Sequence, residues 1–126
     1  MPAASYDFAR ITQGDTLLET FAFTTDGTTP YDLTGATIRT QFRTAPADLG
    51  GTVAIDATAY WTIDPTPTTG RATLEVPASA TAAVSTAASD GSDPIYLVYD
   101  IEIQESGGRV FTWLTGRLPI APQVTA

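Results

Sequence analysis

The reactive side chains of this sequence are mainly carboxylates. The chain has 14 Asp and Glu residues and six Arg, but no His, no Cys and no Lys. Without these three residue types, Ser–His triads, imidazole acid–base catalysis, thiol nucleophiles, Cys- or His-ligated metals and Schiff-base lysines are excluded. Any chemistry of this chain must therefore use carboxylates, hydroxyl groups or backbone oxygens.

Two acidic patterns have spacings that chemistry could use. Asp100 and Glu102 share one face of an alternating segment, and a glycosidase needs two carboxyls across a sugar cleft. We interpret them instead as a solvated strand face, because nothing else in the sequence converges there. Asp90 and Asp93 could offer oxygens to Ca²⁺, but their segment lacks the ligand ladder of a strong calcium loop, which favours a plain turn. The sequence therefore predicts no catalytic residue, no metal site and no cofactor.

Aromatic residues are the second group of interest. Five of them could form core, a protein interface or a sugar-binding platform, in that order of preference: Tyr60, Trp61, Tyr96, Phe111 and Trp113. Strict alternation along 109–120 places Phe111 and Trp113 opposite the apolar face, which would leave both rings exposed. Tyr6 and Phe8 lie in an N-terminal segment that can act as an arm. The predicted interface residues are Tyr6, Phe8, Phe111 and Trp113.

Short alternating segments must position these side chains. Strands are predicted at 16–24, 37–44, 53–56, 60–64, 71–76, 95–104 and 109–120, with turn residues between them. An Ala-rich stretch at 77–89 predicts one short helical segment. No helix-length crossover separates the strands, so an antiparallel all-β sandwich of about seven strands is expected. We predict a single domain over 1–126, with extended arms at 1–10 and 121–126.

The charge of the chain limits its partners. A net charge of −8 repels duplex nucleic acid and acidic membranes, so neither partner is expected. Arg39 and Arg43 share one strand face and can pair with acidic neighbours, but two arginines do not make a nucleic-acid stripe. No apolar run is long enough to span a bilayer, and residues 1–10 lack the pattern of a signal peptide.

One part of the sequence resembles a phage family. Gln13-Gly14-Asp15-Thr16 is followed by an apolar strand, and Asp32-Leu33-Thr34-Gly35-Ala36-Thr37 by a strand that ends near Phe42. This pattern resembles the N-terminal immunoglobulin-like domain of the phage baseplate upper protein family, and small stand-alone virion proteins with the same opening. Later segments, including Val98-Tyr99-Asp100-Ile101-Glu102, fit the same general pattern.

The resemblance implies a non-catalytic immunoglobulin-like β-sandwich in a tailed-phage virion. It would be made in the host cytoplasm and would contact other virion proteins in an oligomeric or symmetric assembly. The family carries further domains after this one, whereas this sequence ends at Ala126, so we expect a tail, baseplate or adaptor role rather than host recognition. Capsid decoration on the head and a carbohydrate-binding module are the alternatives.

Overall fold

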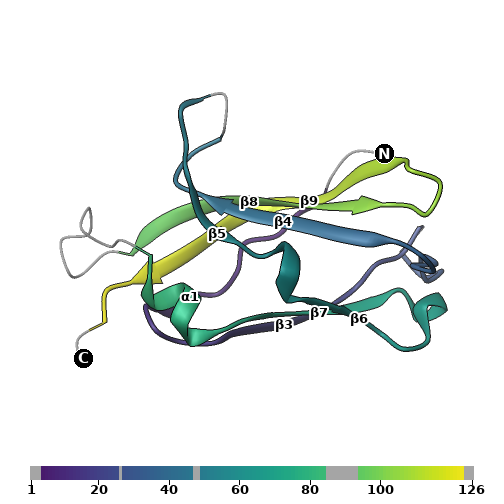
Figure 1. The fold of residues 1–126 in the computed structure, drawn as a ribbon, viewed down its shortest axis with the longest axis horizontal. Helices are drawn as coiled ribbons and strands as arrows, with labels where there is room; N and C mark the ends of the chain where they lie inside the picture. The colour runs from purple at the N-terminus through teal and green to yellow at the C-terminus, as the bar shows by residue number, and fades with distance from the viewer. Residues whose placement is uncertain (1–3, 26, 47–48, 85–93, 124–126) are drawn as a thin grey trace.

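The computed structural model describes residues 4–25, 27–46, 49–84 and 94–123, which form two β-sheets packed face to face (Figure 1). The larger sheet, called sheet A, has the order β1-β9-β8-β4-β5, and β2 also pairs with β9. Its strands are β1 (Ala4–Ser5), β2 (Ile11–Thr12), β4 (Thr37–Arg43), β5 (Val53–Asp56), β8 (Ile95–Gln104) and β9 (Val110–Ala121). The smaller sheet, called sheet B, has the order β3-β7-β6, with β3 (Leu17–Ala22), β6 (Trp61–Ile63) and β7 (Arg71–Val76).

The strand order is that of an immunoglobulin-like sandwich. Strands β9, β8, β4 and β5 follow one another in sheet A, and β3, β7 and β6 follow one another in sheet B, with every one of these pairs antiparallel. This matches strands G, F, C and C′ of the immunoglobulin fold in one sheet and B, E and D in the other. β1 and β2 pair with β9 in the parallel sense. The predicted all-β, immunoglobulin-like sandwich of about seven strands is confirmed.

The predicted strands agree closely with those observed, because inward apolar and outward polar residues alternate along them. In β8, for example, Leu97 and Ile101 are buried and Asp100 is exposed. The Ala-rich stretch forms one short helix, α1 (Ala78–Ala82), and residues 85–93 of that prediction lie outside the described residues, as does the Asp90–Asp93 segment. Two 3₁₀ turns, Thr58–Tyr60 and Pro67–Thr69, complete the described elements. No helix in the described ranges is long and apolar enough to cross a membrane.

An aromatic cluster joins the two sheets at the core. The ring centroids of Phe8 and Tyr99 are 4.9 Å apart, and those of Phe42 and Tyr99 are 5.3 Å apart. Phe21 of β3 lies 6.0 Å from Phe8, and none of the four side chains is more than 9% exposed. In antibody domains a disulfide between strands B and F and a Trp on strand C occupy this region. This chain has no Cys, and ring packing connects the corresponding strands instead.

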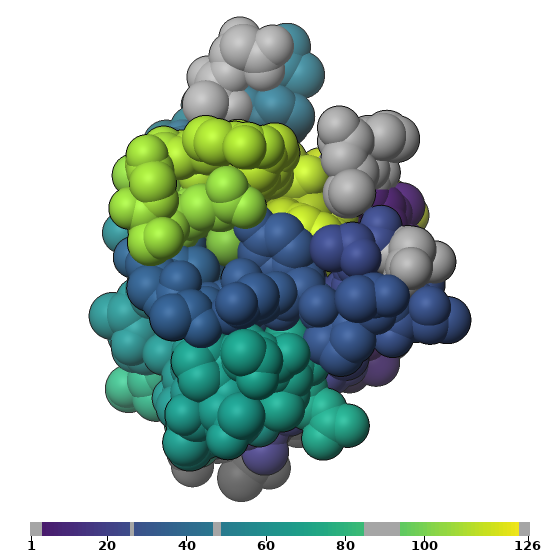
Figure 2. Space-filling model, turned by 90° about the vertical axis from the view of Figure 1, so that its right-hand side faces the viewer, coloured from purple at the N-terminus to yellow at the C-terminus, as the bar shows by residue number. Residues whose placement is uncertain are grey.

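The connector from Tyr31 to Ala36 closes one end of the sandwich. Figure 2 shows this end, where the blue segment before β4 lies between the light-green β8–β9 turn and the teal turn before β7. Leu33 is buried within it, and its N–H donates to the carbonyl of Pro67 at 3.0 Å. Asp32 accepts hydrogen bonds from the N–H and hydroxyl of Thr34, which lower the pKa of its carboxyl. The Asp32–Thr37 motif, which resembles the phage family, therefore packs Leu33 between the two sheets at this end of the sandwich.

The other resembling motif fixes α1 against the start of β3. The side-chain amide of Gln13 donates to the carbonyls of Ala82 and Val84, at 3.1 and 2.7 Å. The buried hydroxyl of Thr81 donates to the carbonyl of Asp15 at 2.7 Å and accepts from the N–H of Gly14 at 3.1 Å. These contacts hold the connection after β7 against the opposite end of the sandwich.

The N-terminal segment is folded along β9. The N–H of Tyr6 donates to the carbonyl of Thr115 at 2.9 Å, and that of Phe8 donates to the carbonyl of Arg117 at 3.0 Å. Gly116 allows this close approach, because a Cβ there would lie 1.8 Å from the carbonyl oxygen of Tyr6. The predicted N-terminal arm is thus part of the folded domain from residue 4 onward, and the predicted C-terminal arm is described only to residue 123.

A β-bulge in β9 corrects the predicted orientation of two aromatic residues. Ile101 and Glu102 of β8 pair with Leu114 and Thr112, so Trp113 has no cross-strand partner. Strict alternation placed Phe111 and Trp113 together on the outer face, and this prediction is wrong. The extra residue shifts the pattern by one position, and Phe111 lies opposite the buried Ile103 on the inner face.

Candidate functional site

The two carboxylates selected from the sequence lie on the outer face of β8. Asp100 is exposed, and its carboxylate has no hydrogen-bond or ion-pair partner among the described residues. Glu102 lies opposite Arg39 of β4, and its Oε1 is 3.3 Å from Arg39 Nη2. The prediction that Arg39 and Arg43 pair with acidic neighbours is confirmed for Arg39 only, because Arg43 forms no ion pair among the described residues and donates to Gly51 and Gln41 instead. Both members of this pair are partly exposed, so the ion pair contributes at most about 1 kcal/mol to stability.

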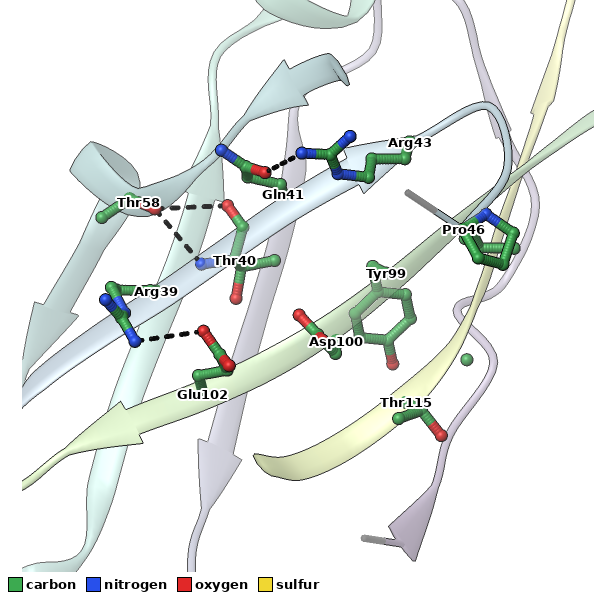
Figure 3. Close-up of a pocket in the computed structure, with 12 residues that line it drawn as sticks. Arg39, Thr40, Gln41, Arg43, Pro46, Thr58, Tyr99, Asp100, Glu102 and Thr115 are labelled. Atoms are coloured by element: carbon green, nitrogen blue, oxygen red, sulfur yellow. Dashed lines mark hydrogen bonds and ion pairs between the residues drawn. The ribbon is translucent and has the colours of Figure 1, made fainter. Parts of the chain in front are cut away.

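These side chains line a groove of about 670 Å³ on the outer face of sheet A (Figure 3). Strands β4, β8 and β9 provide most of its surface, and the connections on either side of β5 contribute Pro46 and Thr58. The lining residues are Arg39, Thr40, Gln41, Arg43, Pro46, Thr58, Val98, Tyr99, Asp100, Glu102, Thr115 and Gly116. The groove therefore brings the predicted Asp100, Glu102, Arg39 and Arg43 together on one surface.

Arg43 fixes the β4–β5 connection beside this groove. Its Nη1 donates to the carbonyl of Gly51 at 3.2 Å, and its Nη2 donates to Gln41 Oε1 at 2.9 Å. Gly51 allows the chain to close, because a Cβ there would lie 1.7 Å from the carbonyl oxygen of Ala45. The pairing register also shifts between Phe42 and Arg43, which bends the strand. The described residues of this connection, 44–46 and 49–52, consequently stand clear of the sandwich beside sheet A (Figure 1).

A hydrogen-bonded turn supports the other side of the groove. The N–H of Thr40 donates to Thr58 Oγ1 at 3.3 Å, and Trp61 Nε1 donates to the buried Thr40 Oγ1 at 3.3 Å. The N–H of Thr58 donates to Asp56 Oδ1 at 3.2 Å, and this hydrogen bond is the main reason that the pKa of Asp56 is lowered. The buried hydroxyl of Thr40 is therefore satisfied, and the turn after β5 is held in place.

The groove keeps unused hydrogen-bonding capacity. The Nε atom of Arg39 is buried, yet it has no acceptor among the described residues. The Asp100 carboxylate is available as an acceptor on the neighbouring strand. No three acidic side chains gather to hold a metal ion in the part of the chain that the structure describes. The arrangement can therefore bind a partner through fixed charges and hydrogen bonds.

Of the four predicted interface residues, Phe8 is a core residue. Its side chain is only 3% exposed and packs in the aromatic cluster. The prediction that Phe8 belongs to an exposed interface is therefore corrected, because the side chain lies in the core. Tyr6 is half-buried, and its hydroxyl donates to Glu19 Oε1 at 2.9 Å. This hydrogen bond is the main cause of the raised pKa of Tyr6.

The other two predicted interface residues also pack within the domain. The Trp113 ring lies 4.8 Å from the ring of Tyr31 and 5.9 Å from that of Phe23, measured between centroids. Phe111 is half-buried beneath the guanidinium of Arg109, at 5.0 Å. Both rings are therefore committed to contacts with the chain's own residues.

The remaining aromatic residues do not form one exposed platform. Trp61 packs 5.6 Å from Phe21, and Tyr60 is half-buried against the core. Tyr96 is 51% exposed, but the Arg117 guanidinium covers its ring at 5.0 Å. The preference for core over a sugar-binding surface therefore agrees with the packing of both tryptophans.

The sequence did not indicate Thr115, Gly116 or Pro46 as groove residues. They join the groove through the pairing of β8 with β9 and through the bend after β4, and both features depend on contacts between distant segments. A usable signal was the alternation of Arg39, Gln41 and Arg43, which marks a polar outer face on a strand with a buried inner face.

Comparison with known proteins adds a structural neighbour. No family model and no curated protein matches this sequence. Among solved structures, the chain is similar to a crystal structure of a chicken TCR, with 16% sequence identity and a TM-score of 0.43. The match covers 98% of this chain and 55% of the TCR chain, so this chain spans about half the length of that neighbour. This distant likeness indicates nothing about binding, and the strand order itself identifies the immunoglobulin-like fold.

Proposed function

We propose that this chain is a structural component of a tailed-phage virion that acts through protein–protein contacts. The observation that supports contact on the outer face of sheet A is the groove, where Asp100 and the buried Arg39 Nε both lack partners in the described chain. Buried donors in folded proteins usually find acceptors. A neighbouring protein that supplies a donor would satisfy the Asp100 carboxylate, and a reorientation of the Arg39 side chain on binding would bring its Nε–H to an acceptor of that protein.

The charge of the chain supports a partner with a basic contact surface. The chain carries a net charge of −8, and Asp100 forms no ion pair among the described residues, although Arg39 and Arg43 line the same groove. Complementary charges speed association and exclude wrong partners more than they raise affinity. Assembly through this face should therefore weaken as salt concentration rises.

The phage setting is supported by the resemblance of residues 11–42 to the baseplate family. The two motifs that carry the resemblance close opposite ends of the sandwich, through the Gln13 contacts to α1 and the buried Leu33. The residues that resemble the family are therefore residues that build this domain. Because the resemblance is to a baseplate family, we propose a position in the tail or baseplate of the virion. Decoration of the capsid is the alternative position.

Mass spectrometry of purified phage particles tests this proposal. Particles from the phage that encodes this chain should contain it, and separation of tails from capsids should place it with the tails. Recovery with capsids alone would instead support decoration of the head. Complete absence of the chain from purified particles would overturn the virion role.

A variant of the groove tests whether this face makes the contact. The change Asp100→Arg should reduce incorporation into particles, because it replaces the unpaired carboxylate of the groove by a guanidinium. Glu75→Arg is the matched control, since Glu75 is exposed on sheet B, does not line the groove, and gives the same change in net charge. Both variants should unfold at the wild-type temperature. Equal incorporation of the two variants would contradict the use of this face.

A further inference from the structure

Strand β3 is the least protected sheet edge among the described strands. It has six residues, pairs only with β7, and contains no Pro, Gly, Lys or Arg. The edge strand β5 has four residues beside a bulge, and β6 has three residues followed by Pro65 and Pro67. The outer side of β9 is covered by β1 and β2. Unprotected edges pair readily with another strand, which is why most edges carry a charge, a Pro or a bulge.

The outward backbone groups of β3 belong to Leu18, Thr20 and Ala22. The N–H of Phe23 donates to the carbonyl of Gly70 at the start of β7, so odd-numbered residues direct their backbone groups toward β7. The hydroxyls of Thr20 and Thr73 are 3.0 Å apart, as expected for a closely spaced, non-hydrogen-bonded pair. The three even-numbered residues consequently present N–H and C=O groups to the open side.

We propose that two copies of this chain pair through β3, antiparallel and about a two-fold axis centred on Thr20. Such an axis, perpendicular to the sheet, places the central residue opposite its own copy. Centring on Glu19 would bring two carboxylates together, which destabilises a cross-strand pair. Centring on Thr20 places Thr20 opposite Thr20 and Leu18 opposite Ala22, and the two B sheets become one continuous sheet.

The outer face of sheet B is self-complementary in this register. Thr62, Thr73 and Thr20 lie in one row across β6, β7 and β3, and the axis continues that row into the second copy. Leu18, which is 60% exposed, would be covered by Ala22 of the other copy. Threonine pairs and apolar pairs across strands each contribute about 0.2–1 kcal/mol.

The charges on β7 are complementary in the same register. Glu75 lies beside Leu18, and Arg71 lies beside Ala22. Pairing Leu18 with Ala22 therefore sets Glu75 of one copy in the same row as Arg71 of the other. The two are about 14 Å apart at the usual strand spacing, so this pairing favours the register more than it adds affinity.

This inference goes beyond the proposed function and does not depend on it. The β3 edge lies on sheet B, and the groove lies on sheet A. Dimer formation is measured on the purified chain alone, whereas incorporation is measured on particles. A monomeric chain could still be incorporated into particles, and a dimeric chain could be absent from them, so the two experiments test the two proposals separately.

Single cysteines give a register-specific test, because the chain has no Cys of its own. Under mild oxidation, Thr20→Cys should form a disulfide-linked dimer, since directly opposite Cα atoms are about 5.5 Å apart. Leu18→Cys alone should not, because its two copies would be about 13 Å apart. An equal mixture of Leu18→Cys and Ala22→Cys should form the mixed dimer. Cross-linking of Leu18→Cys to itself in preference to Thr20→Cys would overturn the register.

Sedimentation of variants without cysteine tests the dimer itself. The wild-type chain should sediment as a dimer at about 100 µM, in the range of weak protein association. Leu18→Lys should raise the dissociation constant at least tenfold, because a lysine on an edge strand opposes pairing. Thr62→Lys, on the same face but at the far edge of sheet B, should leave it within about twofold. A monomeric wild-type chain, or equal weakening by both variants, would overturn the proposal.

Discussion

Replacing Gly116 by alanine should detach the N-terminal segment from β9. The added Cβ would lie 1.8 Å from the carbonyl oxygen of Tyr6 and 3.0 Å from a carboxylate oxygen of Asp7. The first distance is far below van der Waals contact, and the atom that it meets belongs to the backbone. The segment must therefore move, and its movement withdraws Phe8 from the aromatic cluster.

The size of this effect follows from what the segment contributes. Burial of the Phe8 side chain stabilises by about 1.5–3 kcal/mol. The hydrogen bonds from the N–H groups of Tyr6 and Phe8 each contribute about 0.5–1.5 kcal/mol. Full detachment should therefore lower the free energy of unfolding by about 2.5–6 kcal/mol, a large part of the stability of a typical domain.

Urea unfolding, followed by the fluorescence of the two tryptophans, measures this loss. Hydrogen exchange at the amides of Tyr6 and Phe8 shows whether the segment has detached. Gly107→Ala is the matched control, because a Cβ there meets nothing within 4 Å, and its stability should stay within about 0.5 kcal/mol of wild type. Wild-type stability of Gly116→Ala together with continued protection of both amides would show that the segment does not detach.

Three further predictions concern stability, each measured by urea unfolding. Phe42→Ala should cost about 3–5 kcal/mol, because it empties a fully buried position between the sheets; a loss below 1 kcal/mol would contradict this. Burial and the hydrogen bond to Glu105 raise the pKa of Tyr31 to about 12, compared with about 10 in the unfolded chain. Neutral Tyr31 therefore contributes fully to the free energy of unfolding below pH 10, and this contribution is lost as pH rises through 12. Tyr31→Phe should reduce the fall in stability between pH 10 and 12. An unchanged fall would show that the titration of Tyr31 does not cause it. Gln13→Ala should cost about 1–3 kcal/mol by removing two hydrogen bonds to α1, and a neutral effect would show that α1 does not need them.

Local pattern was sufficient to predict the strands and the fold class. The alternation along β8 identifies Leu97 and Ile101 as inward and Asp100 as outward, because one face of an antiparallel sheet is buried and the other is wet. Turn residues between such segments then give a sandwich. The outer-face position of Asp100 and Glu102 follows from the same period.

The orientation of Trp113 and the burial of Phe8 depend on pairing between distant segments. The bulge at Trp113 arises from the register between β8 and β9, and one extra residue reverses the face of every residue on one side of it. Phe8 lies in a segment too short for a period to emerge, and it is buried because Gly116 admits the backbone beside it. The groove likewise exists only after three strands and two connections come together.

A reconstruction of the intact particle by electron cryomicroscopy tests the central claim most directly. The claim is that the chain works by contact between proteins, through the groove of Arg39 and Asp100 on sheet A. Density of a neighbouring protein is expected in that groove, with a hydrogen-bond donor at the Asp100 carboxylate and an acceptor that the reoriented Arg39 side chain contacts. A chain found in the particle with this face open to solvent would contradict the claim.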